Sequence, residues 1–424
     1  MMKVVCVPHE HIPETFADDT VYFSLYHAIP RTSERLGHIA PTFFLDIQRK
    51  RIRPSIAALD FATMAFSIAA ADESIPRSSS ADGWTRMIDL TVALINPEPW
   101  GSLLESFEKT LRFLSGDYWT LHVIEGGVEP EFRGKMRDID ADCVCLLSGG
   151  TDSLIGAIDL VEQGHNPIYI SRTVRGDCEA QRMFAHTLGV PENHYQWGCT
   201  IRKPRGMSEP STRARSLVFF AFAIIAASAF AETGAPIPII VPENGFISLN
   251  IPMTPSRIGS LSTKTTHPIY MEGIQMVMDA LGINAQLQLP YRFKTKGEMI
   301  FECRNQIVLR ELIDDSISCG KYRRHGYKHC GVCVPCLVRR AAYLRAGIED
   351  NTRKGYDVTP SQHSIPEDTM AAACAIIRKH QEGIKSLTSG ALVFSIGEDR
   401  AAYEDVFSRG LGEIEVLLQE YGVI

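Results

Sequence analysis

The chain has 424 residues, of which 45% are hydrophobic and 22% are charged, and its formal net charge is −7. This length favours two or three domains over a single core, and the composition excludes wholesale disorder. Proteins that coat nucleic acid are normally basic, so the acidic balance disfavours stable nucleic-acid binding.

The first 138 residues predict an α+β accessory domain. Residues 3–7, 87–94 and 121–124 have the apolar character of strands, and apolar residues at helical spacing predict a helix over residues 102–114. The apolar run at the N-terminus is too short for the core of a secretory signal. We therefore expect a cytoplasmic protein. This region contains no evident chemical motif.

Residues 139–347 predict a doubly wound α/β domain with a parallel sheet. Residues 143–147 form a continuous apolar run, which is typical of a parallel strand buried on both faces. Further strands and helices are expected in alternation: strands at 166–170 and 237–241, and helices at 154–163, 180–188 and 215–232. Residues 348–424 predict a helical C-terminal region.

The longest apolar run covers residues 217–231. As a helix it would be about 22 Å long, short of the roughly 30 Å of a bilayer's hydrocarbon core. We therefore expect a buried helix rather than a membrane span.

A glycine-rich segment joins the first strand of the α/β domain to its helix. Backbone N–H groups at a helix N-terminus lack intrahelical partners, and the helix dipole favours an anion there. Adjacent glycines let the backbone approach a phosphate closely. A carboxylate beside a polyphosphate requires a cation such as Mg²⁺. An ordinary capped turn is the alternative. The segment, named here the glycine loop, consists of Ser148, Gly149, Gly150, Thr151, Asp152 and Ser153.

The chain has eleven cysteines, an odd number that argues against a disulfide framework. Four of them, named here the cysteine cluster, have the spacing of a closed tetrahedral Zn²⁺ site with a structural role. An iron–sulfur cluster, a redox dithiol and unrelated buried thiols remain as alternatives. The cluster consists of Cys319, Cys330, Cys333 and Cys336.

Three segments within residues 140–347, about half the chain, resemble a known family. The glycine loop resembles the PP-loop of the N-type ATP pyrophosphatases. The cysteine cluster, with the following Leu-Val-Arg-Arg at residues 337–340, resembles the 7-cyano-7-deazaguanine synthases (QueC) of that family. Thr295-Lys296-Gly297-Glu298 resembles QueC's Thr-Lys-x-Glu segment.

The resemblance implies an adenine nucleotide alpha hydrolase-like PP-loop fold with a zinc knuckle at residues 319–336. It also implies the cofactors ATP, Mg²⁺ and Zn²⁺. Asp152 would hold Mg²⁺, while Lys296 and Arg215 would neutralise the phosphates. Arg213 could take the place of Arg215 by a two-residue shift.

The chain departs from QueC in two places. QueC has a substrate loop with Asp-Cys-Arg-Pro after its Gly-x-Asn, whereas this chain continues from Glu243-Asn244 without one. QueC also lacks the N-terminal domain. These features, with residues 113–119 and 255–268, resemble QatC, the QueC-like member of the QatABCD anti-phage defence systems. The resemblance to QatC therefore implies partner proteins from such a system. It leaves open whether the chain forms an oligomer.

Residues 255–267 combine cations and hydroxyls that suit phosphate or carboxylate groups, or form a solvated loop. The expected reaction is that of an ATP-dependent ligase forming C–N bonds. A small carboxylate, 7-carboxy-7-deazaguanine or a related compound, would be adenylated with release of pyrophosphate, and a nitrogen nucleophile would displace AMP. The alternatives are a tRNA-modifying PP-loop enzyme and a non-catalytic ATP-binding scaffold of a defence complex.

Overall fold

The structure is a computed structural model that describes residues 2–30, 32–132, 135, 140–230, 234–253, 264–361, 365–392 and 399–424. The chain divides into two compact units. Unit 1 comprises Met1–Val144, Gln196–Ile239 and Tyr270–Leu287, and unit 2 comprises Cys145–Tyr195, Ile240–Ile269 and Gln288–Ile424. The domain boundaries expected at residues 138 and 347 stay predictions.

The first sheet lies in unit 1 and has the strand order β5-β4-β1-β2-β3-β9. The pairs from β5 to β3 are parallel, and β9 pairs antiparallel with β3. The prediction of an α+β domain is therefore wrong, because this parallel pairing is typical of α/β folds. Helices α1 (Phe43–Lys50) and α2 (Ile56–Ser74) lie between β3 and β4, and α3 (Leu104–Ser115) lies between β4 and β5. The strands are β1 (Met2–Pro8), β2 (Thr20–Leu25), β3 (Leu36–Pro41), β4 (Met87–Leu94), β5 (Tyr118–Glu125) and β9 (Cys199–Arg202).

Helix α2 (Ile56–Ser74) is almost entirely buried and packs against α6 (Arg215–Ser228) within unit 1. Ring centroids of Phe66 and Phe222 lie 5.7 Å apart at this contact. Ser55 caps α2 by accepting a hydrogen bond from the Ala58 N–H at 3.2 Å. The sequence analysis misses α2 because apolar residues occur on all sides of this helix. No polar face remains to give a periodic pattern.

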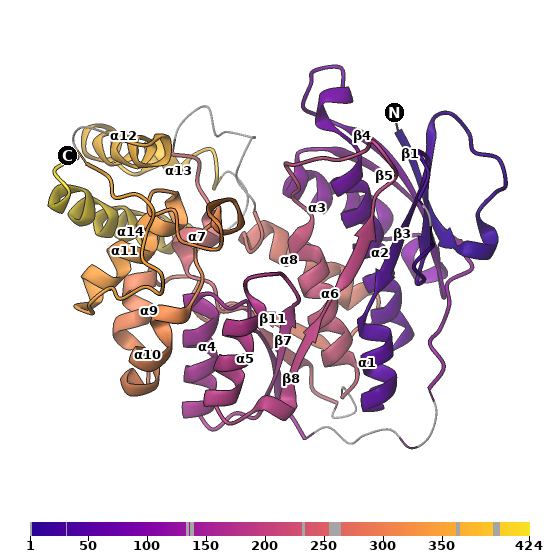
Figure 1. Cartoon of the computed structure of the whole chain (residues 1–424), viewed down its shortest axis with the longest axis horizontal. Coiled ribbons are helices and arrows are strands. Elements are labelled where there is room, and N and C mark those ends of the chain that lie inside the picture. The colour runs from indigo at the N-terminus through magenta and orange to yellow at the C-terminus, as the bar shows by residue number, and fades with distance from the viewer. Residues whose placement is uncertain are drawn as a thin grey trace. The chain divides into compact units, whose positions relative to one another are not determined.

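The second sheet has the order β11-β10-β6-β7-β8. Helices α4 (Thr151–Glu162) and α5 (Cys178–Thr187) follow β6 and β7 along the chain and lie side by side near β7 (Figure 1). This alternation agrees with the predicted α/β architecture, although α4 begins at Thr151 rather than at residue 154. The strands are β6 (Cys143–Leu146), β7 (Pro167–Arg172), β8 (His194–Trp197), β10 (Ile237–Ile240) and β11 (Ala285–Gln288).

The C-terminal region is helical, as predicted. Helices α11, α12 and α14 pack together around a core that includes Leu337, Ile376 and Phe407 (Figure 1). These three helices are α11 (Val334–Ala346), α12 (Glu367–Glu382) and α14 (Arg400–Glu420). The remaining helices are α1 (Phe43–Lys50), α3 (Leu104–Ser115), α7 (Gly245–Leu249), α8 (Pro268–Ala280), α9 (Lys296–Glu302), α10 (Gln306–Leu312) and α13 (Lys385–Thr388).

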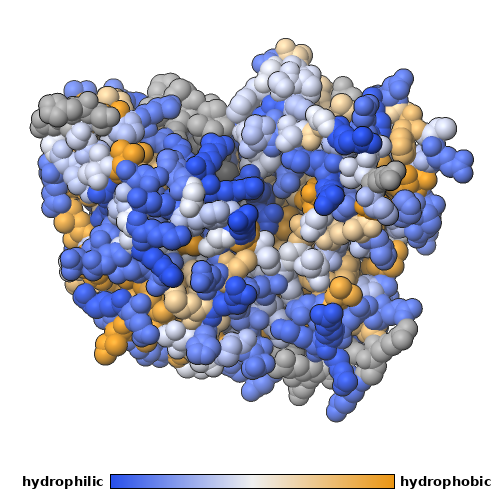
Figure 2. Space-filling view, viewed as in Figure 1, coloured by the Kyte–Doolittle hydropathy of each residue, from blue (hydrophilic) through white to orange (hydrophobic). Residues whose placement is uncertain are grey.

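Within the described ranges, no helix combines the length and apolar character needed to cross a bilayer. Residues 217–228 of the predicted apolar run form most of α6, and most of them are buried, as expected. Hydrophilic residues cover most of the face shown in Figure 2, and hydrophobic ones form small separate patches. The expected cytoplasmic location stays a prediction.

Candidate nucleotide site and metal centre

The glycine loop follows β6, and its last three residues form the first turn of α4. Leu154 donates the first helical hydrogen bond, to the Gly150 carbonyl at 3.0 Å. The N–H groups of Thr151, Asp152 and Ser153 consequently have no intrahelical acceptor. Gly149 has a φ of +90°, which a residue with a side chain rarely adopts. The loop therefore has the backbone form expected of an anion site.

Hydroxyl groups organise the loop from within. The Ser148 hydroxyl accepts the Gly150 N–H at 3.2 Å and donates to the Ser153 hydroxyl at 3.1 Å. The Ser153 hydroxyl in turn donates to the Gly150 carbonyl at 2.9 Å. Ser148 itself is exposed, whereas Thr151 is buried. A phosphate can thus reach the loop from the Ser148 side.

Asp152 is 9% exposed and holds two partners in unit 2. Lys296 forms an ion pair with its Oδ1, and Asn244 donates its Nδ2 to Oδ2 at 2.7 Å. Asn244 also caps α7 by accepting the Ile247 N–H at 3.0 Å, which fixes the amide. The Asn244 N–H also donates to Oδ2, at 3.4 Å. The structure thus brings together two of the three predicted catalytic residues, and Oδ1, which contacts Lys296, retains a further lone pair for a cation.

Helix α9 presents Lys296 from its first position. Thr295 caps the helix in a capping box with Glu298: the Glu298 N–H donates to the Thr295 hydroxyl at 3.1 Å, and the Thr295 N–H donates to Glu298 at 2.9 Å. Glu413 of α14 accepts from the Thr295 hydroxyl and from the Gly297 N–H. The C-terminal helix therefore supports the turn that carries Lys296, a role that the sequence does not indicate.

Glu243 lies beside this group. Its carboxylate accepts a hydrogen bond from the Thr266 hydroxyl. Burial raises the pKa of Glu243 to about 7, the Thr266 hydrogen bond opposes the rise, and the negative charge of Asp152 adds to it. Of the predicted anion-binding loop at residues 255–267, only Lys264 to His267 fall within the described residues. His267 is buried there, and burial lowers its pKa to about 4.

Residues 316–318 form the back of the glycine loop. The Ile317 N–H donates to the Gly149 carbonyl at 2.9 Å, and the Ser316 and Thr151 hydroxyls lie 2.9 Å apart. A cavity of about 90 Å³ opens on the same segment, and its lining includes Gly176, Glu179, Ser316, Ile317, Tyr322 and Lys354. The loop is therefore held in place next to a small polar cavity.

The third predicted catalytic residue, Arg215, is the first residue of α6 and belongs to unit 1. Its alternative, Arg213, is buried in the same unit and donates to the Ser115 carbonyl at 2.7 Å. The backbone N–H groups of Arg213 and Ala214 both donate to Asp72. These contacts give Arg213 a structural role within unit 1, and the role of Arg215 toward ATP stays a prediction.

Arg213 borders a group of buried ion pairs that the sequence analysis does not foresee. Arg86 contacts Asp72 at 2.5 Å and Asp117 at 2.7 Å, and Arg77 contacts Asp117 at 2.8 Å. All four side chains are at most 3% exposed. We name these four residues the arginine–aspartate network. Asp117 lies 31 residues after Arg86, and no local motif links the four residues.

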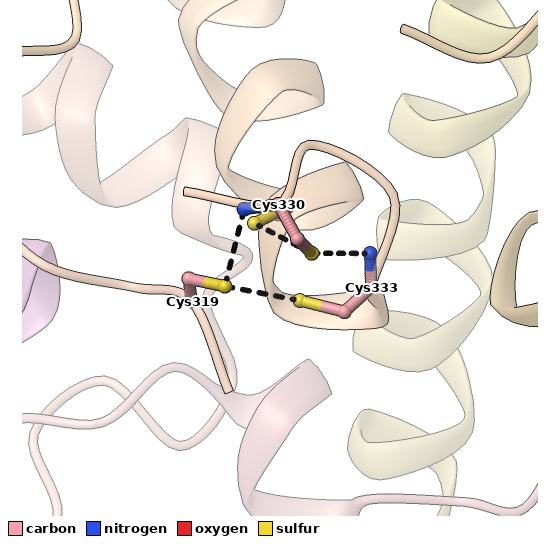
Figure 3. A group of neighbouring side chains, drawn as sticks. Cys319, Cys330 and Cys333 are labelled. Carbon is pink, nitrogen blue, oxygen red and sulfur yellow. Dashed lines mark hydrogen bonds between the residues drawn. The ribbon is translucent and has the colours of Figure 1, made fainter. Parts of the chain in front are cut away.

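The four predicted metal ligands converge in unit 2. Their sulfur atoms all lie within 4.8 Å of one another. The Sγ atoms of Cys319 and Cys333 are 3.9 Å apart, and those of Cys330 and Cys336 are 3.8 Å apart. Figure 3 shows the thiols of Cys319, Cys330 and Cys333 turned toward a common centre. Hydrogen bonds from the neighbouring thiols hold the pKa of Cys330 well below its usual range.

This geometry fits a single tetrahedral ion. Four sulfurs at about 2.3 Å from one zinc ion lie about 3.8 Å apart, which matches the two distances. In an iron–sulfur cluster the four thiolates are divided between two or four irons, and sulfurs bound to different irons lie further apart. Backbone N–H groups of Lys321 and Cys330 point at the Cys319 sulfur at 3.3 and 3.4 Å, which supports a thiolate. The cysteine cluster can therefore hold zinc.

The chain is similar to curated proteins named 7-cyano-7-deazaguanine synthase. It is 28% identical to the protein of Novosphingobium aromaticivorans over 233 residues, which are 50% of this chain and 94% of that protein. The protein of Saccharolobus solfataricus is 24% identical over 48% of this chain and 46% of its own length. That of Methanocaldococcus jannaschii is 30% identical over 20% of this chain and 38% of its own length.

No protein-family profile matches the chain. The similarities support a QueC-like family, in agreement with the resemblance found in the sequence. They bear on about half of the chain. The narrower resemblance to QatC, the PP-loop assignment and the roles of the individual site residues stay predictions.

Proposed function

We propose that the chain is a QueC-like, ATP-dependent ligase that adenylates a carboxylate at the glycine loop. The observation that carries this proposal is the opening of α4 by two glycines, with three N–H groups that have no intrahelical acceptor and the Asp152–Lys296 ion pair beside them. Similarity to the 7-cyano-7-deazaguanine synthases supports an enzyme that uses ATP to activate a carboxylate.

In the proposed reaction, the polyphosphate binds at the glycine loop and receives hydrogen bonds from its N–H and hydroxyl groups. Bound Mg²⁺ would neutralise phosphate charge, and Asp152 would hold it. Lys296 would then exchange its pairing with Asp152 for a phosphate oxygen. Arg215 is proposed as a further phosphate ligand.

A substrate carboxylate oxygen attacks the α-phosphorus, and the bond to the bridging oxygen of the β-phosphate breaks. Pyrophosphate leaves and an acyl-adenylate forms. A nitrogen nucleophile, either ammonia or an amine, then attacks the acyl carbon, loses a proton and displaces AMP. In this scheme the residues act mainly by positioning the reactants and neutralising charge. Zinc at the cysteine cluster would have a structural role.

The carboxylate is proposed to be 7-carboxy-7-deazaguanine or a related compound. Membership of a QatABCD-type defence system, with partner proteins, is proposed from the sequence resemblance alone. The region corresponding to QueC's substrate loop continues directly into α7. We therefore include protein-borne amines among the nucleophiles to be tested.

The direct test is pyrophosphate release from ATP with candidate carboxylates, in the presence and absence of ammonia or partner proteins. Wild type should release pyrophosphate only when a carboxylate substrate is present, and Asp152→Asn should release almost none. Glu382→Gln is a matched control, because Glu382 is exposed and pairs with Arg378 on α12, at 3.4 Å. Retained phage protection by Asp152→Asn, without pyrophosphate release, would favour the scaffold alternative instead.

The metal assignment has its own test. Purified protein should contain about one zinc per chain, and Cys333→Ser should lose it. Acid-labile sulfide and visible absorbance would contradict zinc and indicate an iron–sulfur cluster.

A further inference from the structure

Arg339 lies on α11, three residues after the predicted metal ligand Cys336, and its side chain is completely buried. Its guanidinium makes six hydrogen bonds of 2.6 to 3.4 Å. All six acceptors are neutral oxygens: the Thr151, Ser316, Ser318, Tyr343 and Thr352 hydroxyls and the Ile313 carbonyl.

Among the described residues, no carboxylate lies within ion-pair distance of this guanidinium. The nearest acids reach it only through intermediates: Asp350 accepts from the Thr352 hydroxyl, and Asp314 accepts from the Tyr343 hydroxyl at 3.0 Å. A buried charge without a direct counterion is costly, and hydrogen bonds to neutral groups offset only part of the cost. An anion nearby would stabilise the arrangement.

The guanidinium is directed at the glycine loop. Its NH1 donates to the Thr151 hydroxyl at 3.0 Å and to the Ser316 hydroxyl at 2.6 Å. Thr151 is the first residue of α4, and its backbone N–H is one of the unpaired donors of the loop. The positive charge therefore lies directly behind the predicted phosphate site.

The same contacts connect the loop to the cysteine cluster. Ser318 precedes Cys319, its N–H donates to His329 at 3.2 Å, and His329 precedes Cys330. Helix α11 carries both Cys336 and Arg339. The segments that hold the guanidinium against Thr151 are thus the segments that the four thiols bring together.

We propose that Arg339 is a positioning residue for the glycine loop, and that its buried charge, acting through the Thr151 hydroxyl, increases the affinity of the loop for the polyphosphate of ATP. This inference rests on the proposed function. In this proposal Arg339 acts on ATP binding without touching the nucleotide. It also gives a function to an interior arginine that has no direct carboxylate partner among the described residues.

The test measures binding by titration calorimetry, with Mg²⁺ present, for ATP and for adenosine. Arg339→Met removes the charge and keeps much of the volume. We expect this variant to bind ATP about tenfold to a hundredfold more weakly, which is the range for a charged hydrogen bond. Its affinity for adenosine should be unchanged. Arg339→Lys keeps the charge and should recover part of the ATP affinity. Equal weakening of ATP and adenosine would show a merely structural role and overturn the proposal.

Arg340→Met is the matched control. Arg340 is the next residue of α11, and it donates to the Gly331 carbonyl and stacks on Tyr356 and Tyr421 rather than facing the loop. It should bind ATP like wild type.

Should Arg339→Met fail to fold, Thr151→Val provides the second variant. It removes the intermediate hydroxyl and leaves Arg339 hydrogen-bonded to Ser316. It should weaken the binding of ATP and not that of adenosine, and Thr151→Ser, which restores the hydroxyl, should recover most of the ATP affinity that Thr151→Val loses. ATP binding by Thr151→Val that equals wild type would also overturn the proposal. Failure of wild type to bind ATP would refute the proposed function itself, whereas normal ATP binding by Arg339→Met would refute only this inference.

Discussion

Both units bury ion pairs, but the two sets are constructed differently. In unit 1, protein donors occupy both carboxylates of the arginine–aspartate network: each is paired with arginine, and backbone N–H groups of Arg86 and Arg213 donate to them as well. In unit 2, the Asp152–Lys296 pair lies at the start of a helix whose first N–H groups have no intrahelical acceptor, next to the exposed Ser148. The first arrangement is a structural set of ion pairs, whereas we propose the second as a ligand site. We conclude that burial of charge alone does not identify a functional site.

The largest effect is expected from Asp117→Asn in the arginine–aspartate network. The substitution removes the negative charge that pairs with both Arg77 and Arg86. Breaking a buried ion pair costs about 3–5 kcal/mol of stability. Urea unfolding should show this loss of stability. As a control, Asp19→Asn removes an exposed partner of Lys3 and should change little. An Asp117→Asn protein as stable as wild type would contradict the structural role of the network.

Asp152→Asn should have the opposite profile. The amide keeps hydrogen-bonding capacity toward Lys296 and Asn244 but loses the charge that would hold Mg²⁺. We expect pyrophosphate release to fall about a hundredfold to a thousandfold, and stability to fall less than in Asp117→Asn. Steady-state kinetics together with urea unfolding measure both. If Asp152→Asn lost as much stability as Asp117→Asn and kept its activity, the distinction between the two sets would be wrong.

Glu413→Gln tests the support of Lys296 by α14. The variant keeps an oxygen for the Thr295 hydroxyl and the Gly297 N–H but removes the negative charge at the start of α9. A helix N-terminus interacts with such a charge by up to about 2 kcal/mol, so the KM for ATP should rise about threefold to tenfold. Glu415→Gln, on the same helix but paired with His380 at 2.8 Å, should leave the KM unchanged. An unchanged KM in Glu413→Gln would remove α14 from the account of the site.

The smallest effect concerns Asp177, which lies near Gly149. Burial raises the pKa of Asp177 to about 6, above the value of about 3.9 in an unfolded chain. The folded protein therefore holds this proton more tightly, and it loses stability as the pH rises from about 4 through 6. Asp177→Asn stays neutral, so it should be about 1 kcal/mol more stable than wild type at pH 8 and no more stable at pH 4.

Chemical denaturation at the two pH values measures the Asp177 effect. Glu179→Gln, an exposed neighbour in the first turn of α5, should show no pH-dependent gain. A gain in Asp177→Asn that is the same at pH 4 and pH 8 would exclude the titration as its cause.

Local signals were sufficient for three of the five strands of the second sheet and for the cysteine cluster, but not for β8 and β11. Apolar runs predicted β6, β7 and β10, and cysteine spacing predicted the convergence of four thiols, which the structure confirms. Lys296 was found through its resemblance to a known segment, and the structure brings it to Asp152. Their roles toward ATP remain predictions.

What the sequence could not provide depends on contacts between distant segments. Strand β1 pairs with both β2 and β4, and this parallel pairing leaves no mark in local periodicity. Asp72 and Asp117 meet Arg86 only through the fold of unit 1. Arg339 was noticed only as part of a short motif, because its contact with Thr151 joins residues 188 positions apart.

The most direct test of the central claim is titration of the purified chain with ATP, with and without Mg²⁺, for wild type and Asp152→Asn. The account predicts one ATP site per chain that depends on Mg²⁺ and is weakened at least about tenfold by the substitution. Absence of adenine nucleotide binding in the presence of Mg²⁺, or binding that Asp152→Asn leaves unaltered, would contradict it.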